Sequence, residues 1–126
     1  MTTTDYSGYN LVRPEHLNHF GNLFGGQLLK WVDEFAWLVA TREYPGCTFV
    51  TRAMQDVQFR HQVTQGTILR LAAHCAEAGK TAVHYEVRVH AQPPGARGEN
   101  LVFTTRVTFV NIAPTGEKAP IAPGTR

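Results

Sequence analysis

A single long apolar segment constrains the fold more than any other part of the sequence. Residues 25–42 read GGQLLKWVDEFAWLVATR, with no proline and no turn signal after the two glycines. One helical face collects four apolar residues, Leu28, Val32, Phe35 and Val39. Their spacing predicts an α-helix. Because both tryptophans and further apolar residues extend this surface almost all the way round, we expect the helix to be buried on most sides.

The residues after this helix favour β-strands. Tyr44-Pro45-Gly46 predicts the end of the helix. Strands are expected over residues 47–53, with a continuation at 57–59 beyond a bend, and over residues 67–77, 83–89 and 101–112. Ala78-Gly79-Lys80 is typical of a hairpin connection. One buried helix followed by a meander of strands predicts an α+β fold, in which a curved antiparallel sheet wraps around a long central helix.

The length of 126 residues predicts a single domain. We expect a flexible polar head at residues 1–9, one folded domain at residues 10–113 and a proline-rich tail at residues 114–126. A folded chain of this size leaves much of its surface open, so self-association is plausible.

The net charge, the cysteines and the hydropathy limit which binding partners and which cellular compartment we expect. The net charge is only +2 and no basic block is present, so no nucleic-acid partner is expected. No apolar stretch is long enough to cross a bilayer, and the first ten residues lack the features of a signal peptide. Cys47 and Cys75 have no metal-binding spacing and are expected to be reduced. We therefore expect a cytoplasmic protein without a membrane partner.

Several catalytic motifs are absent from the sequence. The single serine, Ser7, lies in the predicted head, which excludes a GxSxG serine hydrolase. There is no HExxH motif, and His16 with His19 offers only two ligands, so no metal is expected. Gly79-Lys80-Thr81 resembles the end of a P-loop, but His74 stands where that motif requires its first glycine.

The run NHFGNLFGG, residues 18–26, leads directly into the helix and carries the main functional signal. A helix start offers unbonded backbone N–H groups, and Gly25 and Gly26 let a ligand approach them, so they are candidates for an oxyanion hole. Two turns later, Asp33 shares its side of the helix with apolar residues, where a carboxylate is either paired or functional. Lys30, one turn earlier, could neutralise it. The spacing alone leaves both interpretations open.

These motifs resemble the signature of a known enzyme family. The strongest matches are Arg13-Pro14, Asn18, Gly21, Phe24-Gly25-Gly26 and Trp31-Val32-Asp33, and weaker ones follow at Val50-Thr51, residues 59–66, Gly79 and Thr108-Phe109-Val110. Together they resemble the hotdog-fold acyl-CoA hydrolases, which include bacterial short-chain acyl-CoA thioesterases and brain-type acyl-CoA hydrolases. The resemblance extends over residues 11–112.

The resemblance implies an assembly and a mechanism. In this family two subunits join their sheets into a homodimer, the minimal unit, with tetramers and hexamers as larger alternatives. The implied catalytic pair is Asn18 and Asp33, contributed by different subunits. Asp33 would act as general base or nucleophile, and Asn18 would position water or the carbonyl. Backbone groups near Gly25 and Gly26 would bind the oxyanion. The implied reaction hydrolyses acyl-CoA to a carboxylic acid and coenzyme A, with no metal and no separate cofactor.

The resemblance also implies which residues contact the substrate. Thr51 is a candidate for lining the acyl pocket, and the alternative is that it is simply a residue that favours a strand. Arg60 and the hairpin residues Gly79, Lys80 and Thr81 would lie near the coenzyme A phosphates, and a solvated surface position is the alternative for both cations. The hairpin departs from the family pattern because Lys80 offers a point charge in place of a guanidinium fork.

Two other functions fit parts of the same pattern. A hotdog hydroxyacyl dehydratase needs a histidine opposite a carboxylate, a role open to His19 with Asp33, but Asn18 and the double glycine argue against it. A non-catalytic acyl-CoA-binding domain of a regulator would need an attached output module, for which this chain has no room. Replacing Asp33 with asparagine would distinguish the enzyme from the sensor, because only turnover needs the carboxylate.

Overall fold

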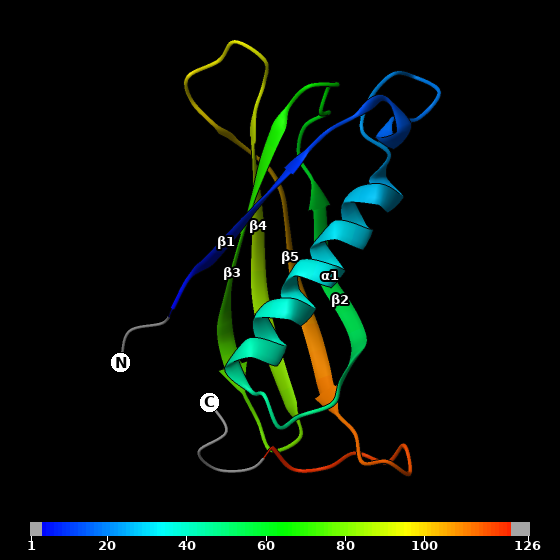
Figure 1. Cartoon of the computed structure of the whole chain (residues 1–126), viewed down its shortest axis with the longest axis vertical. Helices are drawn as coiled ribbons and strands as arrows, with labels where there is room; N and C mark the ends of the chain where they lie inside the picture. The colour runs from blue at the N-terminus through cyan, green and yellow to red at the C-terminus, as the bar shows by residue number, and fades with distance from the viewer. Residues whose placement is uncertain (1–3, 122–126) are drawn as a thin grey trace.

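In the computed structural model, which describes residues 4–121, one long helix lies across one face of a five-stranded antiparallel sheet (Figure 1). In chain order the elements are β1 (Tyr6–Leu11), the 3-10 helix η1 (Pro14–His16), α1 (Gly25–Glu43), β2 (Phe49–Phe59), β3 (Ile68–Ala78), β4 (Ala82–Gln92) and β5 (Asn100–Asn111). The strand order across the sheet is β1-β3-β4-β5-β2. The predicted α+β fold, with a long helix against a curved antiparallel sheet, is confirmed.

The core lies between α1 and the face of the sheet that α1 covers. Strand β4 contributes Val83, Tyr85, Val87 and Val89, which alternate with more polar residues and are at most 1% exposed. They belong to one apolar cluster with the stripe of α1 that includes Val32. The half-buried strand predicted from this alternation is confirmed, and the burial of these apolar side chains stabilises the fold.

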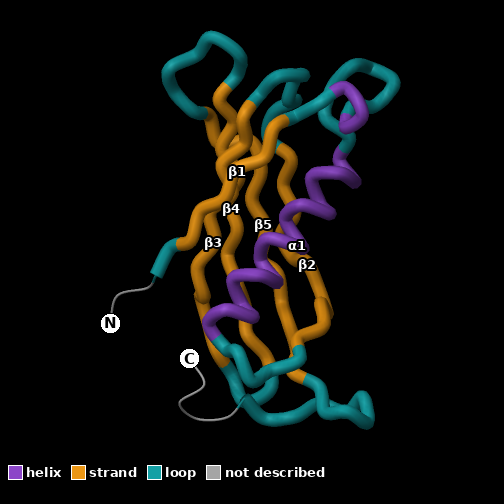
Figure 2. Tube along the Cα trace, in the orientation of Figure 1, coloured by secondary structure: helices purple, strands orange, loops and turns teal. Residues whose placement is uncertain are grey.

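The helix α1 is buried on fewer sides than its sequence predicts. The sheet covers one side of it, and no other element within residues 4–121 packs over the opposite side (Figure 2). Trp37 and Leu38 are 39% and 50% exposed. The expectation of burial on most sides is therefore wrong for a single chain. Within the described residues, no helix combines the length and the apolar character that crossing a bilayer requires.

Strand β1 begins inside the segment predicted to be a flexible head. It pairs with β3, and Gly8 lies so close to α1 that a Cβ atom there would be 2.9 Å from the Phe35 ring. The prediction for residues 1–9 is therefore wrong from Tyr6 onwards. The strand is short and contains a glycine, which weakens its sequence signal. Residues 1–3 of the predicted head lie outside the described residues.

The predicted tail has neither helix nor strand between residues 114 and 121, yet it docks on the end of the sheet. The Ile121 N–H donates to the Lys80 carbonyl at 2.8 Å. The side-chain amide of Asn111 donates to the carbonyl oxygens of Ala119 and Pro120, each at 3.2 Å. These contacts hold the segment against the β3–β4 hairpin. Residues 122–126 of the predicted tail lie outside the described residues.

Strand β2 forms one edge of the sheet and is largely exposed. Of its eleven residues only Phe49 is buried, and Val50, Val57 and Phe59 expose apolar side chains. A register shift between Gln55 and Gln58 lies at the bend predicted before residue 57. A long edge strand with unpaired backbone groups is a template for pairing with another strand.

Candidate active site

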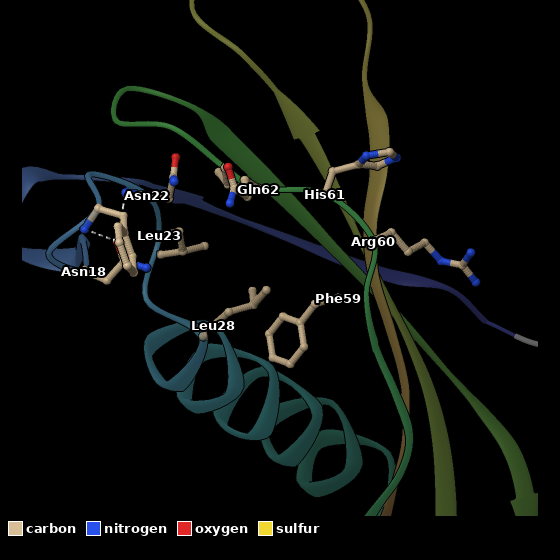
Figure 3. Close-up of a pocket in the computed structure, with 11 residues that line it drawn as sticks. Asn18, Asn22, Leu23, Leu28, Phe59, Arg60, His61 and Gln62 are labelled. Atoms are coloured by element: carbon tan, nitrogen blue, oxygen red, sulfur yellow. Dashed lines mark hydrogen bonds between the residues drawn. The ribbon is translucent and has the colours of Figure 1, made fainter.

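A cavity of about 270 Å³ lies beside the first turn of α1, between two loops (Figure 3). One side is lined by Asn18, Phe20, Asn22 and Leu23 and the other by residues 59–63. The Leu23 N–H donates to the Val63 carbonyl at 2.7 Å. Among the predicted site residues, Asn18, Gly25 and Arg60 line the cavity. Part of the run that carries the main functional signal in the sequence therefore forms one wall of a cavity.

The side chain of Asn18 is held in one orientation by its own loop. Its Oδ1 atom accepts hydrogen bonds from the backbone N–H groups of Phe20 at 2.9 Å and Asn22 at 3.2 Å (Figure 3). Two donors on one oxygen fix which end of the amide is oxygen and which is nitrogen. The Nδ2 group has no hydrogen bond among the described residues. Asn18 therefore offers this cavity a hydrogen-bond donor.

The start of α1 offers further donors. The N–H groups of Gln27 and Leu28 bond to the Phe24 carbonyl, whereas those of Gly25 and Gly26 have no hydrogen bond within residues 4–121. The first turn contains no acidic side chain, so the positive end of the helix dipole is not neutralised locally. This end of the helix can stabilise a carbonyl oxygen that gains negative charge.

Asp33 is bound by a hydroxyl group and not by a cation. The Thr51 hydroxyl of β2 donates to Asp33 Oδ1 at 2.6 Å. The ion pairs of residues 4–121 include neither Asp33 nor Lys30. The alternative in which Lys30 neutralises Asp33 is therefore not supported. The half-buried carboxylate is thus oriented by a hydroxyl group and has no cationic partner among the described residues.

A single chain does not bring Asn18 and Asp33 together. Asp33 lies eight residues after Gly25 in α1, which corresponds to about 12 Å along the helix axis. Neither Asp33 nor Thr51 lines the cavity that contains Asn18. The donors and the carboxylate of the predicted site are thus separated within one protomer.

The predicted coenzyme A contacts are also separated. The β3–β4 hairpin with Gly79, Lys80 and Thr81 lies at the end of the sheet opposite to the cavity (Figure 1). The eleven residues of β4 span more than about 30 Å between these ends. Arg60 lines the cavity, but its guanidinium group points away from the start of α1 (Figure 3). Their contact with substrate stays a prediction.

His61 and Gln62 also line the cavity, although the sequence indicates no role for either residue in the site. Both residues fall in the weak match to the family over residues 59–66, but nothing in the sequence indicates that this loop faces the segment that contains Asn18. His19, the candidate for a dehydratase, packs on the Phe20 ring with centroids 3.9 Å apart and does not line the cavity. In the described part of the chain, no three His, Cys, Asp or Glu side chains come together as a metal site would require.

Residues 20–97 of the chain match the sequence family described as Thioesterase superfamily. The chain belongs to this superfamily. This thioesterase-superfamily chain is 34% identical over 107 residues to Acyl-coenzyme A thioesterase 11 of Mus musculus, a match that covers 85% of this chain and 18% of that protein. The chain spans about a fifth of the length of the first curated relatives that it matches.

Solved structures of acyl-CoA hydrolases have the same fold as this superfamily member. The enzyme from Staphylococcus aureus in complex with butyryl coenzyme A, coenzyme A and coenzyme A disulfide has a TM-score of 0.84 and 25% identity, over 93% of this chain and 71% of that chain. An apo-hexameric acyl-CoA thioesterase has a TM-score of 0.85 and 29% identity, over 93% of this chain and 74% of that chain. The predicted hotdog fold and family are therefore confirmed.

Proposed function

We propose that this protein hydrolyses acyl-CoA thioesters to a carboxylic acid and coenzyme A. The observation that carries the proposal is the Asp33 carboxylate, which is oriented by Thr51 and has no cationic partner among the described residues. Membership in the thioesterase superfamily and the likeness to acyl-CoA hydrolases, one of them in complex with butyryl coenzyme A, support this assignment.

The active site is completed by a second subunit. The exposed edge of β2 would pair antiparallel with β2 of the partner about a twofold axis, which joins the two sheets. With the axis near Met54, at the middle of β2, Thr51 lies beside Val57 of the partner subunit. That position is two residues from Phe59 of the partner subunit, which lines the partner's cavity. The Asp33 carboxylate of one protomer then faces the Asn18 cavity of the other.

Twofold pairing also brings the predicted coenzyme A contacts closer. Because antiparallel edge strands run in opposite directions, the hairpin end of one protomer lies at the cavity end of the other. Gly79, Lys80 and Thr81 of one subunit would then lie on the side from which the coenzyme reaches the partner's cavity. The hexameric state of a protein with the same fold supports assembly beyond the dimer.

The two subunits contribute different groups to the reaction, Asp33 from one and Asn18, Gly25 and Gly26 from the other. Asp33 accepts a proton from water as the water oxygen attacks the thioester carbonyl carbon. The Nδ2–H of Asn18 and the N–H groups of Gly25 and Gly26 bind the oxyanion of the tetrahedral intermediate. When the carbonyl re-forms, the C–S bond breaks, and the proton held by Asp33 passes to the departing coenzyme A sulfur. The carboxylate is regenerated as the acid leaves.

A direct attack by Asp33 is the other balanced route. The carboxylate oxygen would displace coenzyme A thiolate and form a mixed anhydride, which water then hydrolyses. After a single turnover in water labelled with 18O, label in the Asp33 carboxylate demonstrates the anhydride route. General-base catalysis puts the label into the released acid in the first turnover, whereas attack of water on the Asp33 carbonyl of the anhydride leaves the label in the protein.

The proposed function is tested by following free thiol release from acyl-CoA esters between acetyl and palmitoyl, with a phenylacetyl ester added. We expect turnover by the wild type and loss of turnover in Asp33→Asn, with retention of acyl-CoA binding. Binding without turnover in the wild type would overturn the hydrolase and favour a non-catalytic acyl-CoA-binding domain. Full activity of Asp33→Asn would disprove the catalytic role of the carboxylate.

A further inference from the structure

We infer that the cavity at the start of α1 holds the acyl chain of the substrate, and that Phe59 closes this cavity so that only short and medium chains fit. The inference rests on the proposed function and adds the substrate class, because it assigns an acyl length to the site and names the residue that limits it.

The lining of the cavity separates apolar from polar groups. Leu28 and Val63 are only 3% and 5% exposed, and with Leu23 they form an apolar inner surface. The polar part of the lining comes from Asn18, Asn22, Arg60, His61 and Gln62, and no carboxylate contributes to it. Such a lining suits an uncharged hydrocarbon chain with one carbonyl group at the polar wall. The carbonyl would meet the Asn18 amide while the chain contacts the leucine and valine side chains.

The volume of the cavity limits the length of the chain. The cavity measures about 270 Å³. For comparison, an apolar cavity of about 150 Å³ in another protein holds benzene, with its six carbon atoms. The same ratio gives room for on the order of ten carbon atoms. Chains as long as palmitoyl would extend beyond the apolar lining.

Phe59 forms the wall that a longer chain would have to pass. It is the last residue of β2, and its ring packs edge-on against Phe103 with centroids 5.0 Å apart. The other side of the ring approaches the start of α1, where a Cβ atom on Gly25 would be 3.4 Å away. The ring therefore fills the space between the end of β2 and the first turn of the helix (Figure 3). Phe59 is 53% exposed in the single chain, so its replacement leaves the core of the protomer largely intact.

The test measures kcat/KM for straight-chain acyl-CoA esters from two to sixteen carbons. For the wild type we expect kcat/KM to increase about fourfold with each added methylene, which corresponds to the free energy of burying one such group. The increase should stop near eight to ten carbons, and we call this chain length the break. Phe59→Ala should move the break to longer chains by about two carbons or more, and Phe59→Trp should move it to shorter chains. Opposite shifts from one position cannot result from general damage to the fold.

Phe24→Ala is the matched control. Phe24 is 56% exposed and precedes the same helix, but it does not line the cavity. We expect the break to stay at the wild-type length in this variant. A break that neither Phe59 variant moves, or that Phe24→Ala moves equally, would overturn the inference while leaving the thioesterase function intact.

Absence of turnover with every ester would disprove the proposed function itself. The same series of esters would then be examined by equilibrium binding, where the dissociation constant replaces kcat/KM. A chain-length break in affinity that moves with Phe59→Ala would support an acyl cavity in a binding protein. An affinity that is independent of chain length would overturn the inference as well.

Discussion

Asp33 accepts a hydrogen bond from the Thr51 hydroxyl at 2.6 Å, which joins α1 to the exposed edge strand β2. The bond occupies Oδ1, and Oδ2 has no hydrogen-bond or ion-pair partner within residues 4–121. The carboxylate is thus held in place by one oxygen while the other is available to accept a proton. Thr51 is therefore a positioning residue in the proposed mechanism, and its prior assignment to the acyl pocket stays a prediction.

Thr51→Val removes the hydroxyl at nearly constant shape. Because a hydrogen bond to a charged group contributes about 1.5–3 kcal/mol, we expect kcat to fall about 10- to 100-fold. KM should change much less, because the bond orients the base and does not bind the ester. Thr51→Ser keeps the hydroxyl and should recover most of the rate. A loss in KM alone, or no recovery in the serine variant, would contradict the positioning role.

Asn18→Asp keeps the size of the side chain and both hydrogen bonds that Oδ1 accepts from the loop. It replaces the Nδ2 donor with a second carboxylate oxygen, which would repel an oxyanion. We expect kcat to fall about 10²- to 10³-fold, as is typical when one oxyanion donor is removed. The thermal midpoint should stay close to that of the wild type, since the loop contacts persist. A variant with the wild-type rate would show that Asn18 does not stabilise the intermediate.

A composite site predicts complementation between two inactive proteins. Asn18→Asp and Asp33→Asn are each expected to be inactive, because every site in either homodimer lacks one partner. In a mixed dimer, one site combines both mutated residues and the other combines both wild-type residues. After random exchange of subunits at equal concentrations, about a quarter of all sites are intact.

The measurement is thiol release before and after the two variants are mixed, unfolded and refolded together. Recovery to about a quarter of the wild-type rate is the expected result. The control mixes Asp33→Asn with Thr51→Val, which belong to the same half of the site, so that no mixed dimer contains an intact site. The absence of recovery in the first pair would place Asn18 and Asp33 within one protomer's site.

The sequence predicts most of the fold because its local patterns agree with the final packing. The helical spacing between Leu28 and Val39 and the alternation from Val83 to Val89 both reappear as buried faces in the structure. The sequence does not predict strand β1, because YSGYNL contains a glycine and several polar residues, and the segment forms a strand by pairing with β3. The apolar pattern predicts burial of Trp37 and Leu38, but both are exposed. A sequence pattern does not reveal that a single sheet covers only one side of the helix.

The sequence predicts less of the candidate site than of the fold. Gly25 and Asp33 stand out because a glycine at a helix start and a carboxylate on an apolar face each need a reason, whereas Asn18 follows only from the resemblance to the hotdog acyl-CoA hydrolases. Phe59 and His61 line the cavity because two segments that are distant in the sequence lie side by side, joined by the Leu23–Val63 hydrogen bond. Tertiary contacts of this kind leave no periodic signal in the sequence. The separation of Asn18 from Asp33 within one chain follows from the helix geometry, and it fits the implication of the resemblance that different subunits contribute them.

Tyr85 and Glu43 provide a prediction about stability that is independent of the active site. The fully buried Tyr85 hydroxyl donates to Glu43 Oε1 at 2.6 Å. Burial, assisted by this hydrogen bond and by the Glu43 charge, raises the pKa of Tyr85 far above its ordinary value of 10.0. Below about pH 10 the hydroxyl is protonated in both the folded and the unfolded chain, and its contribution to stability is complete. Above that pH the unfolded chain releases the proton while the folded chain retains it, so stability falls as the pH rises.

We therefore expect the free energy of unfolding of the wild type to decrease by up to about 1.4 kcal/mol per pH unit above pH 10 from this group. Tyr85→Phe should lower stability at pH 7 by about 1–3 kcal/mol, because the bond to the buried carboxylate is lost. The same variant should remove the contribution of Tyr85 to the alkaline slope. Urea unfolding between pH 7 and 11 measures both effects, with Tyr9→Phe as the control because Tyr9 is 68% exposed. An alkaline slope that is equal in the wild type and in Tyr85→Phe would mean that Tyr85 ionises as readily in the folded chain as in the unfolded one.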